Sequence, residues 1–157
     1  MGKIITIEQS IEVVKRLKHH GKRIVLIGGI FDLIHRGHVE FLERARKEGD
    51  SLIVLLESDA KTREVKGKSR PINPQKDRAY VLSRFIMIDY IILLPYFKKD
   101  QDYERLVNTV QPDIIAVTKA DSLMELKRKY ARKVGGKLIE VIARLKDYST
   151  TTIEEKL

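Results

Sequence analysis

Cysteine and tryptophan are absent from the 157-residue sequence, which has only four prolines and 6% aromatic residues. Without cysteine the chain can form no disulfide, no thiolate metal site and no cysteine nucleophile, and this is compatible with an intracellular protein. Few aromatic side chains leave little surface on which nucleic-acid bases could stack. These absences count against a disulfide-stabilised secreted protein and against a dedicated nucleic-acid binder.

Long apolar runs are missing as well. No apolar stretch reaches the ~18 residues of a membrane span, and the first residues, Met1 to Ile4, lack the apolar core of a signal peptide. We therefore expect a cytoplasmic protein with no membrane partner. The length suits a single domain over 1–157, with an N-terminal helix over 7–20 as an extension, that buries about two-thirds of its unfolded surface.

Positive charge is abundant, with a formal net charge of +9. The basic side chains are dispersed along the chain, and glutamates are scattered among them, so nucleic acid is not expected as the main ligand. A basic surface that attracts small polyanionic substrates fits better. Abundant Lys, Arg, Glu and Ile without cysteine also suit a thermophilic source.

Apolar runs alternate with amphipathic stretches from residue 7 onward, which predicts an α/β fold. We expect a single Rossmann-like domain with a five-stranded parallel sheet, helices on both faces and a ligand crevice at the carboxyl ends of the strands. The predicted strands span 24–30, 51–57, 89–94, 113–117 and 137–142. The predicted helices span 7–20, 37–48, about 100–110 and 121–134, with others beginning at Asn73-Pro74 and near Ser149, and a long polar loop covers 58–73.

The most informative segment runs from Gly29 to His38 and reads Gly-Ile-Phe-Asp-Leu-Ile-His-Arg-Gly-His. It lies where a buried strand should give way to a helix, and a helix N-terminus offers unpaired backbone N–H groups and a positive dipole end to an anion. His35 and His38 can add hydrogen bonds that strengthen as charge shifts on a phosphate. A lone histidine there is usually an ordinary surface or core residue, but the whole pattern favours a phosphate site.

This segment resembles the defining motif of the cytidylyltransferase-like nucleotidyltransferases, Gly-Thr/Cys-Phe-Asp-X-X-His-X-Gly-His. The resemblance implies that Gly29, Ile30, Phe31 and Gly37 bind the nucleotide. Ile30 stands where the family carries Thr or Cys, so a backbone contact at that position can be retained while a side-chain contact cannot.

Two further segments suit anions. Basic residues cluster in the 58–73 loop with Gly67 and Pro71; they are Lys61, Arg63, Lys66, Lys68 and Arg70. A charge run in a loop is most often a solvated face, but this one should lie at the ligand edge of the sheet, and Arg78 should point toward the same crevice. Hydroxyls at 149–152 precede the last predicted helix. They can be explained by capping, yet four in a row exceed what one cap requires.

Nearly the whole chain resembles the adenylyltransferase domain of bacterial ADP-heptose synthesis, which acts on D-glycero-β-D-manno-heptose 1-phosphate. The matching segments are Ser58-Asp59-Ala60, Lys66 to Pro74 followed by Arg78, Val110 to Asp113, and Tyr148-Ser149-Thr150-Thr151. The segment from Lys66 to Arg78 is distinctive for that subgroup. Glycerol-3-phosphate cytidylyltransferases and archaeal FAD synthases are similar over the same elements.

Two departures leave the nucleotide open between ATP and CTP. The heptose enzymes carry Lys-Gly-Gly-Asp-Tyr where this chain reads Thr-Lys-Ala-Asp-Ser at 118–122, and Arg144 matches an arginine of the glycerol-phosphate enzymes. The longer match favours ATP. The resemblance implies that Lys119 and Asp121 lie near the base.

The resemblance implies in-line attack by a substrate phosphate on the α-phosphorus of a nucleoside triphosphate, with release of pyrophosphate. It assigns His35 and His38 to the triphosphate, Lys66 to the α-phosphate, and Arg78 with the turn at 149–151 to the β- and γ-phosphates. The nucleotide-binding group also includes Tyr148, and the expected substrate-binding residues are Asp32, Asp59, Arg70 and Arg144. Mg²⁺ is expected as a cofactor bound mainly through the phosphates, without a set of protein ligands.

Alternatives remain within and outside the enzyme class. A CTP-dependent glycerol-phosphate-type enzyme and an FAD synthase-like adenylyltransferase use similar motifs. A nucleotide- or RNA-binding protein could keep the fold without the chemistry. A homodimer is left open as the oligomeric state.

Overall fold

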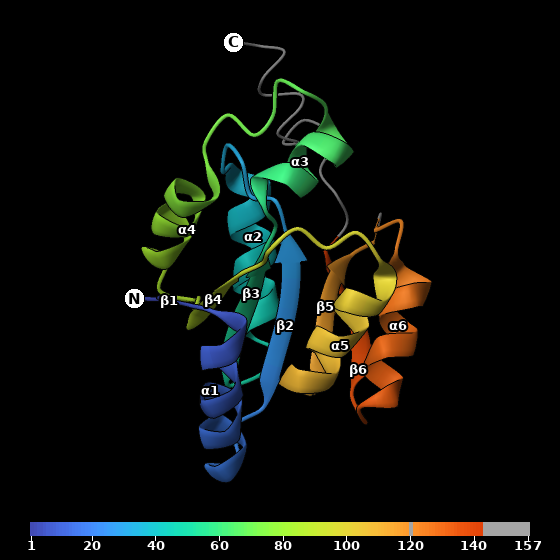
Figure 1. Ribbon diagram of the computed structural model, residues 1–157. Coiled ribbons are helices and arrows are strands. Elements are labelled where there is room, and N and C mark those ends of the chain that lie inside the picture. The colour runs from blue at the N-terminus through green and yellow to red at the C-terminus, as the bar shows by residue number, and fades with distance from the viewer. Residues whose placement is uncertain (120, 143–157) are drawn as a thin grey trace.

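The structure is a computed structural model that describes residues 1–119 and 121–142 (Figure 1). The predicted final helix near Ser149 lies outside the described residues. So do five predicted site residues, namely Arg144, Tyr148, Ser149, Thr150 and Thr151. No helix in the described part is long and apolar enough to cross a membrane.

One parallel sheet forms the centre of the described chain, with the strand order β1-β4-β3-β2-β5-β6. Its strands are β1 (Lys3–Ile5), β2 (Ile24–Gly29), β3 (Ser51–Leu56), β4 (Tyr90–Leu93), β5 (Ile114–Thr118) and β6 (Lys137–Ile142). β2, β3 and β5 are largely buried runs of aliphatic residues, as expected for strands covered on both faces. The Rossmann-like α/β prediction is confirmed.

The predicted number of five strands is wrong, because the described residues form six. The additional strand is β1, in which Lys3 pairs with Tyr90 and Ile5 with Ile92. Three residues are too few to show an alternating or continuous apolar pattern, so only pairing with β4 makes this segment a strand. The predicted strands and helices otherwise begin and end within three residues of the observed bounds.

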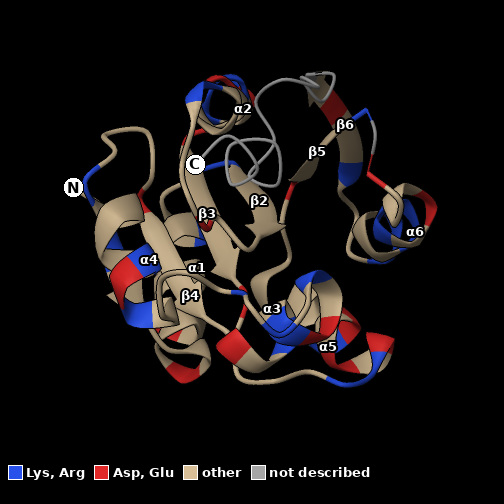
Figure 2. Ribbon diagram, turned by 90° about the horizontal axis from the view of Figure 1, so that it is seen from above, with Lys and Arg blue, Asp and Glu red and all other residues tan. Residues whose placement is uncertain are grey.

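Helices cover both faces of the sheet (Figures 1 and 2). On one face α1 (Ile7–His19), α5 (Asp100–Val110) and α6 (Met124–Lys133) pack residues such as Val13, Leu106 and Tyr130 onto a core cluster. On the other face α2 (Arg36–Arg46) and α4 (Gln75–Ser83) contribute Leu42 and Leu82 to a second cluster. Each cluster gathers side chains from one face of the strands, as a doubly covered sheet requires.

The polar segment 58–73, predicted to be a loop throughout, contains a helix, α3 (Asp59–Lys66). The Ser58 side chain caps it by accepting from the backbone N–H of Lys61, and the buried Thr62 hydroxyl donates to the Ser58 carbonyl. The helix ends at Gly67, whose φ of 106° is a conformation that favours glycine. The serine cap before Asp59 was the sequence signal for this helix, and the density of charge obscured it.

Aspartates organise the amino ends of the strands. Carboxylates of Asp50, Asp89 and Asp113 accept hydrogen bonds from the backbone N–H groups of Arg23, Leu52 and Ile24, respectively, each at 2.8 Å. These bonds tie the turn before one strand to the beginning of its neighbour. The carboxyl ends, at the top of Figure 1, lie beneath α3 and beside the beginning of α2.

Candidate functional site

The turn between β2 and α2 forms the first wall of the site. Phe31 and Leu33 both have positive φ, near 50° and 54°, so the chain reverses tightly after the strand. A Cβ atom on Gly29 would lie 2.6 Å from the Phe31 ring, which explains why only glycine fits there. Phe31 is buried within this turn, and His35 follows as the residue that caps the N-terminus of α2.

His35 and His38 cap α2 reciprocally. The backbone N–H of Gly37 donates to Nδ1 of His35 at 3.1 Å, and the backbone N–H of His35 donates to Nδ1 of His38 at 3.2 Å. An accepting Nδ1 assigns each neutral ring its proton on Nε2. The two ring centroids are 3.9 Å apart and the planes are inclined by 32°. The helix start therefore carries two imidazoles stacked at a tilt, with Nε2–H donors.

Its environment keeps His38 neutral. Burial is the largest cause and, with electrostatic interactions from His35 and Lys66, lowers the pKa of His38 to about 3. A neutral imidazole at physiological pH donates one hydrogen bond from Nε2 without adding a full charge. The charge of Lys66, the last residue of α3, contributes to this shift.

Asp32 anchors the segment that follows α3. Its fully buried carboxylate accepts from the backbone N–H groups of Ile72 and Asn73 at 2.6 and 3.1 Å, and from Nε of the buried Arg70 at 3.0 Å. Burial alone would raise the pKa of Asp32, but these hydrogen bonds and the Arg70 charge outweigh it and hold the pKa below its usual range. Asp32 and Arg70, predicted to bind substrate, instead bind each other and fix residues 70–73.

Arg78 connects the same segment to the glycine turn. Its side chain is only 1% exposed, and its three nitrogens donate to the carbonyls of Asn73 and Ile30 and to the carboxylate of Asp59. The distance to Asp59 is 2.7 Å. The prediction that Arg78 contacts the β- and γ-phosphates is not supported by this geometry, because the guanidinium faces protein oxygens. Arg78 and Asp59 act here as positioning residues for the Ile30 backbone.

Gln75 is a positioning residue that the sequence analysis missed. Its Nε2 atom donates to the carbonyls of Leu56 and Leu94, which lie at and just beyond the ends of β3 and β4, at 3.0 and 2.9 Å. Its backbone N–H donates to Asp59 at 2.8 Å. A glutamine in the first turn of a helix carries no pattern of its own, so only the fold reveals this role.

A cavity of about 460 Å³ opens at the carboxyl ends of β2, β3 and β5, beneath α3 and against α5 and α6. Predicted site residues that line it are Gly29, Ile30, Lys66 and Asp121. Apolar side chains such as Leu94, Val107 and Leu126 form much of the rest of the wall. Lys119 is exposed at the end of β5, and Asp121 binds Lys127 at 2.7 Å. The cavity is large enough for part of a nucleotide or a small phosphorylated molecule.

Glu57 and Tyr103 form a further pair in this cavity that the sequence analysis did not single out. The Tyr103 hydroxyl donates to Oε2 of Glu57 at 2.7 Å. Burial raises the pKa of the Glu57 carboxyl, although the Tyr103 hydrogen bond and the positive charges of Lys61 and Lys127 oppose the shift. Burial and Glu57 also raise the pKa of Tyr103. Nothing in the local sequence marks this pair, because its members are 46 residues apart.

The described residues include no cluster of three or more His, Cys, Asp or Glu side chains suited to a metal ion. The two aspartates nearest the glycine turn, Asp32 and Asp59, already accept hydrogen bonds from arginines.

Comparison with known proteins identifies the family of this chain. Residues 26–156 match the cytidylyltransferase-like family. A bifunctional protein HldE from Nitratiruptor is 46% identical over 68% of this chain, and one from Geotalea uraniireducens is 36% identical over 99% of it. The chain spans only 22% and 31% of the lengths of these two curated relatives.

Solved structures show the same fold. The lipopolysaccharide core biosynthesis protein of Thermoplasma volcanium has a TM-score of 0.64 and 29% identity, covering 79% of this chain and 98% of that protein. A pantoate–β-alanine ligase from Francisella tularensis reaches a TM-score of 0.70 over all of this chain and 74% of its own, but at 14% identity it supports the fold alone.

The fold is a Rossmann-like α/β domain, with a His-X-Gly-His turn between β2 and α2. The chain belongs to the cytidylyltransferase-like family, and the resemblance seen in the sequence is thereby confirmed.

Proposed function

We propose that this protein transfers an adenylyl group from ATP to the phosphate of a sugar phosphate, such as heptose 1-phosphate, and releases pyrophosphate. An acceptor phosphate oxygen forms a new bond to the α-phosphorus. The bond from that phosphorus to the bridging oxygen breaks, and its electron pair leaves with pyrophosphate. The observation that carries the proposal is the pair of stacked imidazoles at the α2 N-terminus.

The protein contributes alignment and charge stabilisation, since phosphoryl-type transfer requires no protein nucleophile. Nε2–H of His35 and His38 and the backbone N–H groups of the first turn of α2 donate to triphosphate oxygens. Lys66 balances charge at the α-phosphate. Arg78, Asp59 and Asp32 hold the glycine turn and residues 70–73 in place around these donors.

Mg²⁺ would be held by the phosphates and water, and when bound it neutralises charge on the triphosphate and on the departing pyrophosphate. The cavity is lined by three carboxylates and three lysines, and the phosphates of such a complex would lie toward the lysines, Lys61, Lys66 and Lys127. We propose ATP rather than CTP because the match from Lys66 to Arg78 extends over more residues than the single Arg144 that leans toward CTP.

Two lines of support point to a sugar phosphate as the acceptor. The longest resemblance in the sequence is to heptose 1-phosphate adenylyltransferases, and the relatives with the highest identities reported above are HldE proteins. The cavity also combines basic residues with polar groups that could hold a hydroxylated ligand. We further propose a cytoplasmic location, and a homodimer is a secondary proposal to be checked by light scattering.

The test is pyrophosphate release measured with ATP or CTP against a panel of acceptors. The panel contains D-glycero-β-D-manno-heptose 1-phosphate, mannose 1-phosphate, glycerol 3-phosphate and FMN. We expect release with ATP and a sugar 1-phosphate. Release only with CTP and glycerol 3-phosphate, or only with FMN, would replace the proposed substrates. Nucleotide or RNA binding without release in any combination would favour the non-enzymatic alternative.

A further inference from the structure

The Glu57 carboxylate has one oxygen in use and one without a partner. Tyr103 donates to Oε2 at 2.7 Å, whereas Oε1 is buried and has no hydrogen-bond partner among the described residues. Glu57 lines the 460 Å³ cavity. A buried acceptor left unsatisfied is unfavourable, and such groups in native proteins commonly meet a ligand or an ordered water. Oε1 is therefore a buried, unsatisfied acceptor on a residue that lines the cavity.

The charges around Glu57 indicate what kind of group it accepts from. A second anion such as a phosphate is repelled by a carboxylate, so the ligand's phosphate should lie toward Lys61 and Lys66 instead. A cationic ligand group is not required either, since Lys61 and Lys127 already act on Glu57. What remains is a neutral donor, and a sugar hydroxyl is such a donor.

The position of Glu57 in the sheet indicates which substrate carries this donor. Glu57 directly follows β3, and β2 separates β3 from β5, after which Asp121 lies. Glu57 therefore lies in the part of the cavity next to β3 and α5, away from Asp121. We propose that Glu57 is a specificity-determining residue whose Oε1 accepts a hydrogen bond from a hydroxyl of the acceptor sugar phosphate. This inference rests on the proposed function.

Tyr103 completes the arrangement as a positioning residue. Its hydroxyl holds Oε2, and its ring packs edge-on against Phe97 with centroids 5.0 Å apart, so the carboxylate cannot turn freely. A site built to bind a substrate hydroxyl discriminates strongly against analogues that lack it, because the buried polar group is then left unpaired. We therefore expect Glu57 to favour a polyhydroxylated phosphate over an acceptor that places an apolar group next to Oε1.

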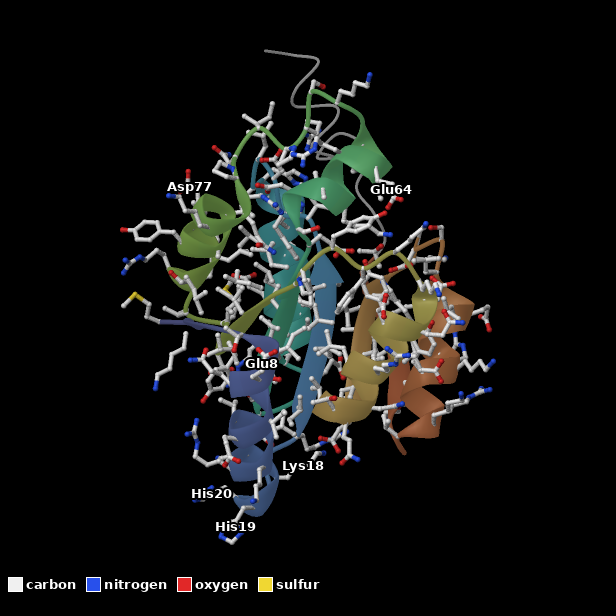
Figure 3. All side chains as sticks on the ribbon, in the orientation of Figure 1. Glu8, Lys18, His19, His20, Glu64 and Asp77 are labelled. Carbon is white, nitrogen blue, oxygen red and sulfur yellow. The ribbon has the colours of Figure 1, made fainter. Side chains whose placement is uncertain are left out.

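The test measures binding without turnover. Wild type and Glu57→Leu are titrated by calorimetry with mannose 1-phosphate and heptose 1-phosphate in the presence of Mg²⁺ and a non-hydrolysable ATP analogue. Glu8→Leu, an identical change on the exposed side of α1 far from the cavity, is the matched control (Figure 3). We expect Glu57→Leu to weaken sugar phosphate binding about tenfold or more, with the affinity for the ATP analogue changed less than twofold.

Monodeoxy analogues of mannose 1-phosphate identify the hydroxyl. At least one analogue should lose about tenfold in affinity for the wild type and almost nothing for Glu57→Leu, since the two changes remove the same hydrogen bond. Glu57→Gln keeps the side-chain shape and an oxygen for Tyr103, so it provides the same comparison if Glu57→Leu does not fold.

Each outcome decides a different claim. Unchanged sugar phosphate binding by the Glu57 variants, or a parallel loss of ATP-analogue affinity, overturns the inference while leaving the proposed function standing. A wild type that binds the ATP analogue but neither sugar phosphate contradicts the proposed acceptor class and, with it, this inference.

Discussion

The two ends of the sheet use the same residue types for different purposes. At the amino ends, exposed Asp50 binds one backbone N–H, and His19 and His20 lie at the free end of α1 (Figure 3). At the carboxyl ends, Asp32 is fully buried and His35 and His38 stack over a helix N-terminus. The difference teaches that the role of these side chains depends on the backbone geometry around them, because the same residue types at the amino ends only connect neighbouring strands or lie at a helix end.

The aspartates provide the first way to break this comparison. Asp32→Ala should lower the free energy of unfolding by about 3–5 kcal/mol, since it leaves the buried Arg70 without its carboxylate. Asp50→Ala, which removes one exposed hydrogen bond, should cost about 1 kcal/mol. Urea unfolding at neutral pH measures both values. Equal costs at the two ends would show that residues 70–73 are not held by Asp32.

The histidines provide the second way to break this comparison. His38→Ala should lower kcat in the pyrophosphate-release assay by about 10²-fold or more, because loss of one transition-state donor typically costs about 3 kcal/mol. His19→Ala should leave kcat unchanged, since His19 lies at the opposite end of the molecule. Thermal unfolding of both variants checks that folding is retained. Normal turnover by His38→Ala would mean that the site has been misassigned.

The pH dependence of stability tests whether His38 is buried and neutral in the folded protein. The folded protein holds the pKa of His38 near 3, below the ordinary 6.5. Between those values the unfolded chain binds a proton that the folded chain does not, so this residue makes the protein less stable as the pH falls from 6.5 toward 3. Nitrogen-detected imidazole NMR should show His38 as the neutral Nε2–H tautomer throughout pH 7 to 5. Titration of that signal near pH 6 would contradict the buried, neutral assignment.

Much of this arrangement could be predicted from the sequence. Buried aliphatic runs such as Ile24–Gly29 predicted the strands, and the glycines and histidines of 29–38 predicted the turn from β2 into α2, because both signals are local. β1 escaped prediction because three residues hold no period, and α3 escaped because its charges suggested a solvated loop.

The roles of the charged residues could not be predicted in the same way. A pattern shows that Asp32, Arg70 and Arg78 lie near one sheet edge, but it does not show whether they face a ligand or one another. Whether a charged side chain faces a ligand or another residue depends on hydrogen bonds between residues far apart in the chain, such as that from Arg78 to the Ile30 carbonyl at 2.6 Å. Glu57 and Tyr103 were missed for the same reason.

The smallest expected effect concerns α3, which has no counterpart at the amino ends of the strands. An eight-residue helix is marginal by itself, and Lys66 lies in its last turn, followed by Gly67. Nucleotide phosphates that bind Lys66 should hold the helix over the cavity and exclude water, as closing segments do in many enzymes. We expect amides of residues 60–70 to exchange about fivefold more slowly with ATP and Mg²⁺, while those of α1 remain unchanged.

Exchange at 60–70 that is the same with and without nucleotide would mean that α3 is already closed or takes no part in binding. Lys66→Ala should abolish the protection, because the bound phosphate then has no ammonium to hold.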